Sequence, residues 1–265
     1  MRTALTIAGS DSGGGAGIQA DLKTFAAHGV FGTSAITAIT AQNTLGVSGV
    51  HVVPVEMVRA QIDAVIGDIG ADAVKIGMLA TAAIIDAVAG AIDELRLSPV
   101  VLDPVMVAKG GSRLLEPDAI DAMRRLLPRA AVVTPNLAEA EVLTGLAVRE
   151  ITSMEAAARA LVGAGAGAAL VKGGHLESDA IVDVLWDGRA LHRFESRRID
   201  TPHTHGTGCT LAAAIAAGLA LGLSLQESVA RAHRYVQAAI AAAPGLGKGH
   251  GPLDHFPKTL FRILK

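Results

Sequence analysis

A glycine-rich hexapeptide at the start of a helical stretch carries the only cysteine of the chain. It reads His-Gly-Thr-Gly-Cys-Thr at 205–210, and a run of small apolar residues follows at 211–218. Glycines directly before a helix leave backbone N–H groups free at its positive end, which suits a transferring phosphoryl group. The same field lowers the pKa of a cysteine, so we expect Cys209 to be a thiolate that acts as a base. The alternative is an inert packing cysteine, the commoner fate of this residue type.

Three polar side chains each follow a short apolar run typical of a buried strand. They are Asp103, Asn136 and Lys172. Ligands of open α/β sheets bind outside the carboxyl ends of the strands. We therefore expect these three residues to gather at one edge of a sheet and to form part of a site.

Asn136 and Glu139 lie three residues apart, so both can occupy one face of the first turn of a helix. Such a pair could hold a hydrated Mg²⁺ ion, which prefers one or two carboxylates together with waters and phosphate oxygens. The alternative is structural, with Asn136 as the N-cap and Glu139 completing a capping box. From these residues alone the structural interpretation is favoured.

A second glycine-rich segment, Gly-Ser-Asp-Ser-Gly-Gly-Gly-Ala-Gly at 9–17, lies between an expected strand and an expected helix. The dinucleotide-binding spacing fails because Ile18 stands where a third glycine is required, and a phosphate-binding loop of the Walker type lacks its Lys-Ser/Thr. The remaining interpretation is a loop whose backbone approaches a ligand closely, with a flexible turn as the alternative. Asp21, one helical turn further on, reads by position as a solvated acid in the first turn.

Two weaker signals favour structural roles. His203 and His205 form a His-x-His pair without further ligands, for which we expect a role in a turn. Met78 follows an apolar strand, where a methionine most often packs in a core.

The elements that must position these residues alternate between short apolar runs and amphipathic segments. We expect strands at 3–8, 73–76, 100–102, 130–133 and 168–171, and helices at 18–28, 54–68, 82–95, 136–144 and 156–164, with two Ala-rich helices over 208–243. This alternation predicts a mostly parallel sheet that is covered by helices on both faces.

Two β-rich pairs interrupt the alternation. The runs at 33–41 and 47–53 are expected to form a small lid within 32–53 that projects from the sheet. The runs at 181–186 and 191–196 flank Asp187-Gly188, a strong hairpin signal, and are expected to form a hairpin at the sheet edge.

Composition narrows the class of protein. A chain of 265 residues with 51% hydrophobic content fits one α/β domain over 1–265. A net charge of −2 and 3% aromatic residues give no footprint for nucleic acid. A single cysteine excludes an internal disulfide and favours a reducing compartment, so we expect a cytoplasmic protein. The longest small-apolar run falls short of the ~20 residues of a membrane span, and we expect no membrane contact.

Taken in order, seven segments resemble the hydroxymethylpyrimidine/phosphomethylpyrimidine kinases of thiamine biosynthesis, which belong to the ribokinase-like superfamily. They are GSDSGGGAGIQAD at 9–21, AQNT at 41–44, KIGM at 75–78, DPVM at 103–106, TPNLAEA at 134–140, VKGGH at 171–175 and THGTGCT at 204–210. The resemblance extends to GKGHGPLDHF at 247–256 and thus covers nearly the whole chain. Each motif alone is only suggestive, whereas the ordered set is specific.

This resemblance implies a three-layer α/β/α sandwich with a small β lid and a homodimer. It implies two ATP-dependent phosphorylations, of 4-amino-5-hydroxymethyl-2-methylpyrimidine to its monophosphate and then to the diphosphate. The implied roles are: Asp21 and Gln42 hydrogen-bonding the aminopyrimidine; Gly9, Met78 and Val105 lining its pocket; Gly206, Thr207 and Gly208 forming an anion hole; Cys209 as the base; Asn136, Lys172 and Gly173 near the nucleotide; and Glu139, with Asp103 through water, serving Mg²⁺.

Two other functions are weighed against this one. A pyridoxal or pyridoxine kinase would act on a ring that also presents a hydroxymethyl group. A non-catalytic pyrimidine-binding regulator would not need the intact Gly-Thr-Gly-Cys and Asn-x-x-Glu motifs. Sugar kinases of the superfamily carry Asp where Cys209 stands, and the apolar Met78 and Val105 favour a flat heteroaromatic ring over a sugar. The sequence leaves open the efficiency of the second phosphorylation, any activity on pyridoxal and any dependence on a monovalent cation.

Overall fold

The computed structural model describes residues 1–106, 119–174 and 180–259. Nine strands in these ranges form one sheet with the order β3-β2-β1-β4-β5-β6-β7-β8-β9. Their bounds are β1 Thr3–Asp11, β2 Phe31–Asn43, β3 Gly46–Val52, β4 Ala73–Ile76, β5 Val100–Leu102, β6 Val132–Val133, β7 Ala169–Val171, β8 Ala180–Trp186 and β9 Leu191–Arg197. The pairs from β2 through β1 to β7 are parallel, and the flanking pairs β2–β3, β7–β8 and β8–β9 are antiparallel.

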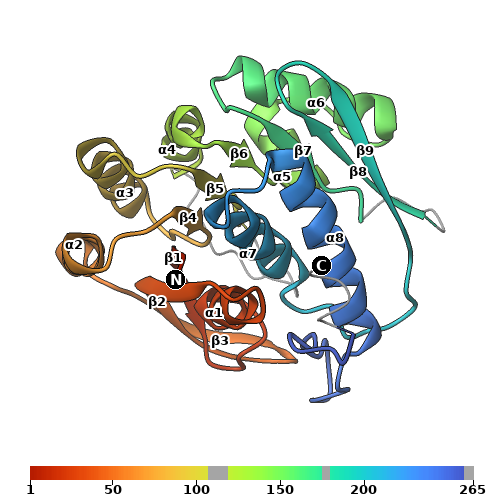
Figure 1. The fold of residues 1–265 in the computed structure, drawn as a ribbon, viewed down its shortest axis with the longest axis horizontal. Helices are drawn as coiled ribbons and strands as arrows, with labels where there is room; N and C mark the ends of the chain where they lie inside the picture. The colour runs from red at the N-terminus through yellow and green to blue at the C-terminus, as the bar shows by residue number, and fades with distance from the viewer. Residues whose placement is uncertain (107–118, 175–179, 260–265) are drawn as a thin grey trace.

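Helices cover both faces of the sheet, as Figure 1 shows. Their bounds are α1 Gly17–Ala27, α2 Val55–Asp68, α3 Ala82–Leu95, α4 Ala119–Leu126, the 3₁₀ turn Leu127–Arg129, α5 Leu137–Thr144, α6 Ile151–Gly163, α7 Thr207–Ala220 and α8 Leu225–Ala241. One apolar core lies between the sheet and α2 to α6, and a second lies between the sheet and α1, α7 and α8. The predicted three-layer α/β/α architecture is confirmed.

The short central strands explain why the parallel part of the sheet is so well buried. Every residue of β4, β5, β6 and β7 is buried. Apart from Lys75 in β4 these strands are wholly apolar, which is the pattern expected of parallel strands covered on both faces. Their carboxyl ends consequently share one edge, where polar residues can meet.

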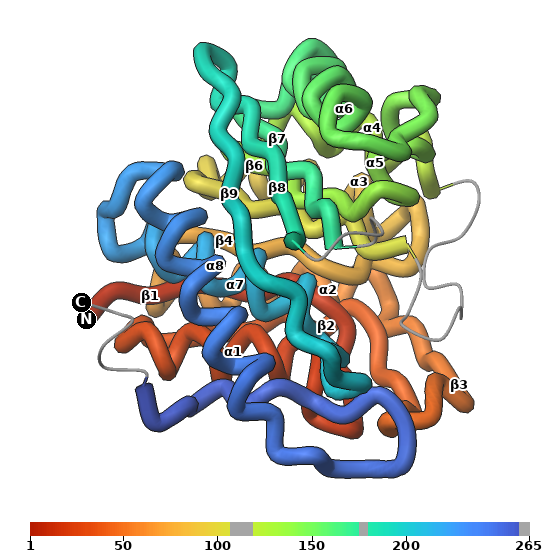
Figure 2. The backbone as a smooth tube through the Cα atoms, turned by 90° about the vertical axis from the view of Figure 1, so that its right-hand side faces the viewer, coloured from red at the N-terminus to blue at the C-terminus, as the bar shows by residue number. Residues whose placement is uncertain are grey.

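The segment expected to form a lid is continuous with the main sheet. Strand β2 pairs in parallel with β1 from Phe31 to Thr40, and it pairs in antiparallel fashion with β3 from Ala38 to Asn43. The β2–β3 end therefore extends beyond the parallel sheet, away from β8 and β9 in Figure 2. Most of β3 is exposed, as expected of an edge strand.

Two boundaries differ clearly from the sequence-based expectation, each for a local reason. Strand β1 continues through Ser10 and Asp11 because these residues pair with β2 after a bulge. Helix α6 begins at Ile151, five residues earlier than the 156 expected, because Glu150 and Ser153 form a capping box. Helix α4 was not predicted at all. Among the described residues, no helix combines the length and hydropathy needed to cross a membrane.

Candidate active site

A cavity of ≈ 1630 Å³ lies along the carboxyl edge of the parallel strands. Its walls include the ends of β1 and β2, the segments after β5, β6 and β7, and the N-terminus of α7. Twelve of the expected site residues line it: Gly9, Gln42, Met78, Asp103, Val105, Asn136, Glu139, Lys172, Gly206, Thr207, Gly208 and Cys209. Asp21 and Gly173 are not brought to its surface.

The N-terminus of α7 has the geometry expected of an anion hole. Gly206 is the N-cap with φ 82°, and a Cβ on it would collide with the carbonyl oxygen of Gly15. Only glycine fits such a left-handed position against another backbone without strain. Among the residues that the structure describes, no side chain caps this N-terminus. Gly206, Thr207, Gly208 and Cys209 line the cavity at the positive end of this helix, and the Thr207 N–H also donates to the carbonyl oxygen of Thr204 at 3.4 Å.

Cys209 lies in that first turn, half-buried and on the cavity wall. Burial raises the pKa of its thiol to about 11, although Lys75 and the backbone N–H of Gly17 act to lower it. Asp103 and Asp21 raise the pKa further. The prediction that Cys209 is a thiolate is therefore wrong for the protein alone, because desolvation outweighs the helix field. Its predicted position in the first turn of this helix is confirmed.

Lys75 is a site residue that sequence reasoning missed. Its Nζ lies 2.8 Å from Oδ2 of Asp21, and both side chains are fully buried. Burial acts to lower the pKa of Lys75, but Asp21 and then Cys209 raise it above its usual range. The signal was present in the sequence: a lysine interrupts the buried strand Ala-Val-Lys-Ile.

Asp21 faces Lys75 and Thr6, whose Oγ1 donates a hydrogen bond to Asp21 at 2.6 Å. It is thus sealed behind the wall that Lys75 forms, and it is not the solvated acid that its position in the first turn of the helix suggested.

A charged cluster faces the anion hole from the other strands. Lys172 Nζ lies 2.9 Å from Oδ1 of Asp103, and a Cβ on Gly208 would lie 3.3 Å from the same ammonium. The expectation that Asp103, Asn136 and Lys172 gather at one edge is confirmed.

Asn136 and Glu139 form the capping box that was weighed as the structural alternative. The backbone N–H of Asn136 donates to Glu139 Oε2 at 2.8 Å, and that of Glu139 donates to Asn136 Oδ1 at 2.9 Å. Both residues also line the cavity. Burial, together with the charge of Asp103, raises the pKa of Glu139 to about 7, against the opposing effect of Lys172.

Asp103 and Glu139 are the carboxylates of the cavity wall that would hold a divalent cation. The charges of Asp103 and Glu139 disfavour each other, and a cation between them would relieve that repulsion. No cluster of three or more His, Cys, Asp or Glu suited to a metal occurs within the described ranges. One or two carboxylates supplemented by waters and phosphate oxygens is the environment that Mg²⁺ prefers, so the residues present fit this ion.

An apolar patch of the cavity wall adjoins Gly9 of β1. Met78 packs with Ala38, Ala80 and Val105 in a small separate cluster. A Cβ on Gly9 would lie 3.0 Å from the sulfur of Met78, so glycine here leaves Met78 in place. This wall suits a flat ring, as expected.

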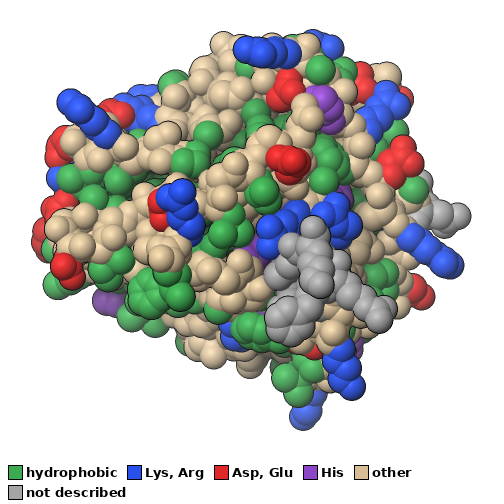
Figure 3. All heavy atoms as spheres, viewed as in Figure 1, with side chains coloured by type: hydrophobic (Ala, Val, Ile, Leu, Met, Phe, Trp, Pro, Cys, Tyr) green, Lys and Arg blue, Asp and Glu red, His purple; other side chains and the backbone are tan. Residues whose placement is uncertain are grey.

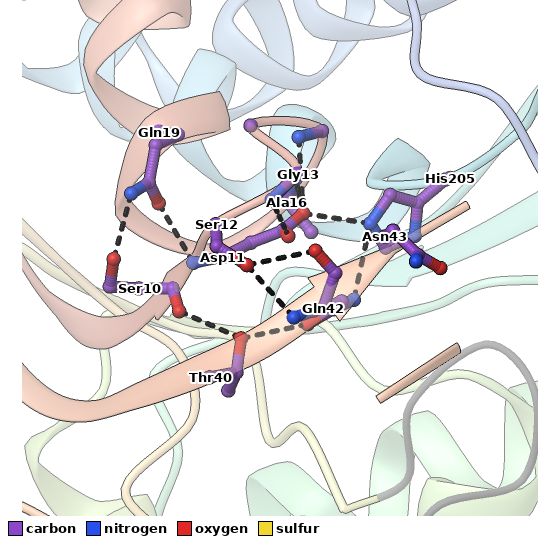
Figure 4. A network of polar contacts seen from close by, with 12 residues as sticks. Ser10, Asp11, Ser12, Gly13, Ala16, Gln19, Thr40, Gln42, Asn43 and His205 are labelled. Atoms are coloured by element: carbon purple, nitrogen blue, oxygen red, sulfur yellow. Dashed lines mark hydrogen bonds and ion pairs between the residues drawn. The ribbon is translucent and has the colours of Figure 1, made fainter. Parts of the chain in front are cut away.

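The glycine-rich loop after β1 is wrapped around Asp11 (Figure 4). The Asp11 carboxylate accepts hydrogen bonds from the backbone N–H groups of Gly13, Gly15 and Ala16 at 2.8, 3.0 and 2.8 Å. His205 Nε2 lies 2.9 Å from Asp11 Oδ2 and ties this loop to the anion hole. Sequence reasoning missed Asp11, although an acidic residue inside a glycine-rich loop was a signal for it. The ion pair of His205 with Asp11 agrees with the role in a turn that was expected for His205.

Gly173 packs behind the cavity. Its N–H donates to Asp183 Oδ1 at 2.8 Å, and a Cβ on it would collide with the carbonyl oxygen of Val182. Its neighbours Lys172 and Gly174 line the cavity in its place.

Comparison with known proteins shows that the sequence is similar to a family of kinases. A family model described as phosphomethylpyrimidine kinase matches residues 11–254. A hydroxymethylpyrimidine/phosphomethylpyrimidine kinase of Rhizobium meliloti is 55% identical over 257 residues, covering 96% of each chain. A protein of the same name from Bacillus subtilis is 51% identical over 255 residues, covering 96% of this chain and 94% of its own. A thiamine biosynthesis bifunctional protein of Geobacter sulfurreducens is 55% identical, and this chain spans 51% of its length.

Solved structures show the same relationship. The ADP complex of Bacillus subtilis pyridoxal kinase superposes with a TM-score of 0.90 at 41% identity, covering 99% of both chains. A phosphomethylpyrimidine kinase of Clostridium difficile superposes with a TM-score of 0.81 at 41% identity, covering 91% of this chain and 100% of its own.

Proposed function

This chain belongs to the phosphomethylpyrimidine kinase family, and from that premise we propose that it transfers the γ-phosphoryl group of ATP to 4-amino-5-hydroxymethyl-2-methylpyrimidine and then to the resulting monophosphate, for thiamine biosynthesis. One observation carries the proposal. The uncapped N-terminus of α7, with Cys209 in its first turn, faces a cavity that is basic at Lys172 and apolar at Met78 and Val105. ATP as the co-substrate agrees with relatives of pyridoxal kinase type that are solved with ADP and with AMP-PCP.

The proposed mechanism assigns the phosphoryl group to the first turn of α7. Backbone N–H groups at Gly206, Thr207 and Gly208 stabilise the charge that spreads over the transferring oxygens. Lys172, adjacent to Gly208, adds a positive charge on the nucleotide side, where Asn136 also lines the wall. Gly173 contributes by letting the strand behind Lys172 pack closely.

Mg²⁺ would be held by Glu139 and Asp103, and it would neutralise negative charge on the phosphate oxygens. Because the pKa of Glu139 is about 7, part of the protein carries a proton there at neutral pH, and cation binding would displace it.

Cys209 is proposed to accept the proton of the substrate hydroxyl. A thiol with a pKa of about 11 must ionise first, so the first phosphorylation should accelerate as the pH rises above 7. Lys75 and the N–H of Gly17 are the groups that favour the thiolate. On the substrate, Gln42 is proposed to bind the aminopyrimidine edge, with Gly9, Met78 and Val105 around the ring. Asp21 is proposed to act through Lys75, since it does not reach the cavity.

A second function is favoured by one observation: the solved pyridoxal kinases superpose closely on this chain. A coupled ATPase assay with hydroxymethylpyrimidine, its monophosphate and pyridoxal, side by side, tests both. We expect the two pyrimidines to give the higher kcat/KM. A higher value for pyridoxal would reverse the assignment, and pyrimidine binding without ATP turnover would indicate a regulator.

We further propose a homodimer formed through the β2–β3 end. Val50 and Val52 are exposed apolar side chains on β3, which is an edge strand of the sheet within the described residues, and Ile39 on β2 and Leu45 in the turn are exposed as well. Light scattering of the protein and of a Val50→Lys variant tests this.

A cytoplasmic location is proposed because a reducing compartment preserves the Cys209 thiol. On the face drawn in Figure 3, acidic and basic side chains are interspersed, which agrees with a small-molecule partner rather than a nucleic acid.

A further inference from the structure

The donor and acceptor roles of the groups around Gln42 conflict with one another, and this conflict decides the orientation of its side-chain amide. The side chain lies between Thr40 and His205 at the end of β2, as Figure 4 shows. As placed, Gln42 Oε1 is 3.1 Å from Thr40 Oγ1, and Gln42 Nε2 is 3.3 Å from His205 Nε2. The oxygen and nitrogen of an amide are similar in shape, so their assignment must follow from the groups that surround them.

The first half of the conflict is at His205. Asp11 already accepts three backbone N–H bonds, and hydrogen bonding with His205 and these amides keeps its pKa below its usual value despite burial. An ionised carboxylate only accepts hydrogen bonds, so His205 Nε2 must carry the proton that it shares with Asp11. That nitrogen is then a donor, and the Gln42 Nε2 group facing it is a donor too.

The second half is at Thr40. Its hydroxyl has one proton and two neighbouring acceptors, the carbonyl oxygen of Ser10 at 2.9 Å and Gln42 Oε1 at 3.1 Å. One proton cannot be donated to both acceptors at once, so one of the two oxygens lacks this hydrogen bond.

Rotation of the amide by half a turn resolves both halves. Thr40 then donates to Ser10 and accepts from Gln42 Nε2, while Gln42 Oε1 accepts from His205 Nε2. His205 Nε2 has one proton, which lies between Asp11 Oδ2 at 2.9 Å and the Gln42 amide oxygen at 3.3 Å, and no donor faces another donor after the rotation.

We propose that Thr40 and the Asp11–His205 pair lock the Gln42 amide with its oxygen toward His205 and its nitrogen toward Thr40, and that this lock selects the ring that the kinase accepts. The inference rests on the proposed function. An aminopyrimidine edge presents an amino donor next to a ring-nitrogen acceptor, and one primary amide held in one orientation pairs with both. A pyrimidine with a 4-oxo group presents the reverse order, and a locked amide cannot turn to meet it.

The test compares two ligands and two variants by calorimetric titration. The ligands are 4-amino-5-hydroxymethyl-2-methylpyrimidine and its 4-oxo analogue. Thr40→Val removes the hydroxyl at nearly constant shape, and Thr40→Ser retains it. We expect the preference for the amino ligand, measured as the ratio of the two Kd values, to fall roughly tenfold in Thr40→Val, the size of one hydrogen bond of about 1.4 kcal/mol. Thr40→Ser should keep the wild-type ratio.

Equal weakening of both ligands in Thr40→Val, or an unchanged ratio, would overturn the inference, because either result assigns Thr40 a structural role only. An independent measurement is the ¹⁵N spectrum of the His205 ring, where we expect a proton on Nε2; a neutral ring protonated only on Nδ1 would also overturn it. If the wild-type protein binds neither pyrimidine, the proposed function fails along with the lock. If it phosphorylates the amino ligand while the ratio is insensitive to Thr40→Val, only the lock fails.

Discussion

At the scale of single residues, the site combines groups that oppose each other. Burial raises the pKa of the Cys209 thiol, whereas the Lys75 ammonium and an N–H of the neighbouring loop lower it. In the part of the chain that the structure describes, Asp21 is the one charged side chain within ion-pair distance of Lys75. The pKa of Cys209 therefore depends on a buried ion pair, of which Lys75 lines the cavity and Asp21 does not.

Replacement of Lys75 tests this dependence. Lys75→Met should raise the pKa of Cys209 by at least about one unit, making its alkylation by iodoacetamide roughly tenfold slower at pH 8. The reaction is clean because the chain has one cysteine. Since an unpaired buried Asp21 would destabilise the fold, Lys75→Met/Asp21→Asn is the second variant. An unaltered alkylation rate in both variants would show that Lys75 does not act on the sulfur.

At the scale of elements, a glycine with left-handed backbone lies just before helix α7 and another just after it. Gly206 has φ 82° and is pressed against Gly15, whereas Gly222 has φ 84° with nothing near its missing Cβ. The two positions share the same backbone strain and differ only in their surroundings. They therefore form a matched pair for separating the anion hole from helix stability.

We expect Gly206→Ala to lower kcat/KM by roughly 10²–10³, the effect typical of losing a preorganised oxyanion donor. Gly222→Ala should leave kcat/KM nearly unchanged while lowering the free energy of unfolding by ~1–3 kcal/mol for the left-handed residue, whereas Gly206→Ala adds the collision with Gly15 to that cost. Kinetic assays and urea titrations of both variants provide the comparison. Similar losses of activity at the two glycines would mean that α7 contributes stability rather than a phosphate site.

The elements also show how far the sequence reaches. Alternating apolar runs predicted the parallel strands and most helices, and the glycines at 206 and 208 predicted the start of α7. Helix α4 was missed. The burial of a side chain could not be predicted from its neighbours in the sequence. The position of Asp21 suggested that it is exposed to solvent, and the position of Cys209 suggested that it is a thiolate, yet strands distant in the sequence create both environments. The Asp11–His205 tie likewise joins residues 194 positions apart.

At the scale of the whole molecule, two buried histidines couple the fold to pH. His28 and His255 lie on either side of Tyr235, whose ring contacts His28 and whose hydroxyl donates to the carbonyl of His255 at 2.8 Å. Burial lowers the pKa of each histidine to about 4. Both are therefore neutral in the fold at pH values where the unfolded chain binds protons.

The sign of the pH dependence follows. Below the histidine pKa of ~6.5 in the unfolded chain, the unfolded state binds protons that the folded state does not bind. The free energy of unfolding therefore falls as the pH drops from 6.5 toward 4, by up to about 3 kcal/mol per histidine. Glu139 acts in the opposite direction, because its pKa of about 7 lets the fold bind a proton first. Urea titrations from pH 7 to 4.5 should therefore show a smaller loss in His28→Asn/His255→Asn than in the wild type. Parallel profiles for the two proteins would contradict the assignment.

The most direct test of the central claim, that Cys209 removes a proton beside the anion hole, is the rate of each phosphoryl transfer in Cys209→Ala. The first transfer starts from a neutral hydroxyl and should slow by roughly 10²–10⁴. The second starts from a phosphate with a pKa of about 6, already ionised at pH 7, and should slow far less. Single-turnover kinetics with hydroxymethylpyrimidine and with its monophosphate separate the two steps. Equal slowing of both would contradict the account and would indicate damage to the anion hole instead.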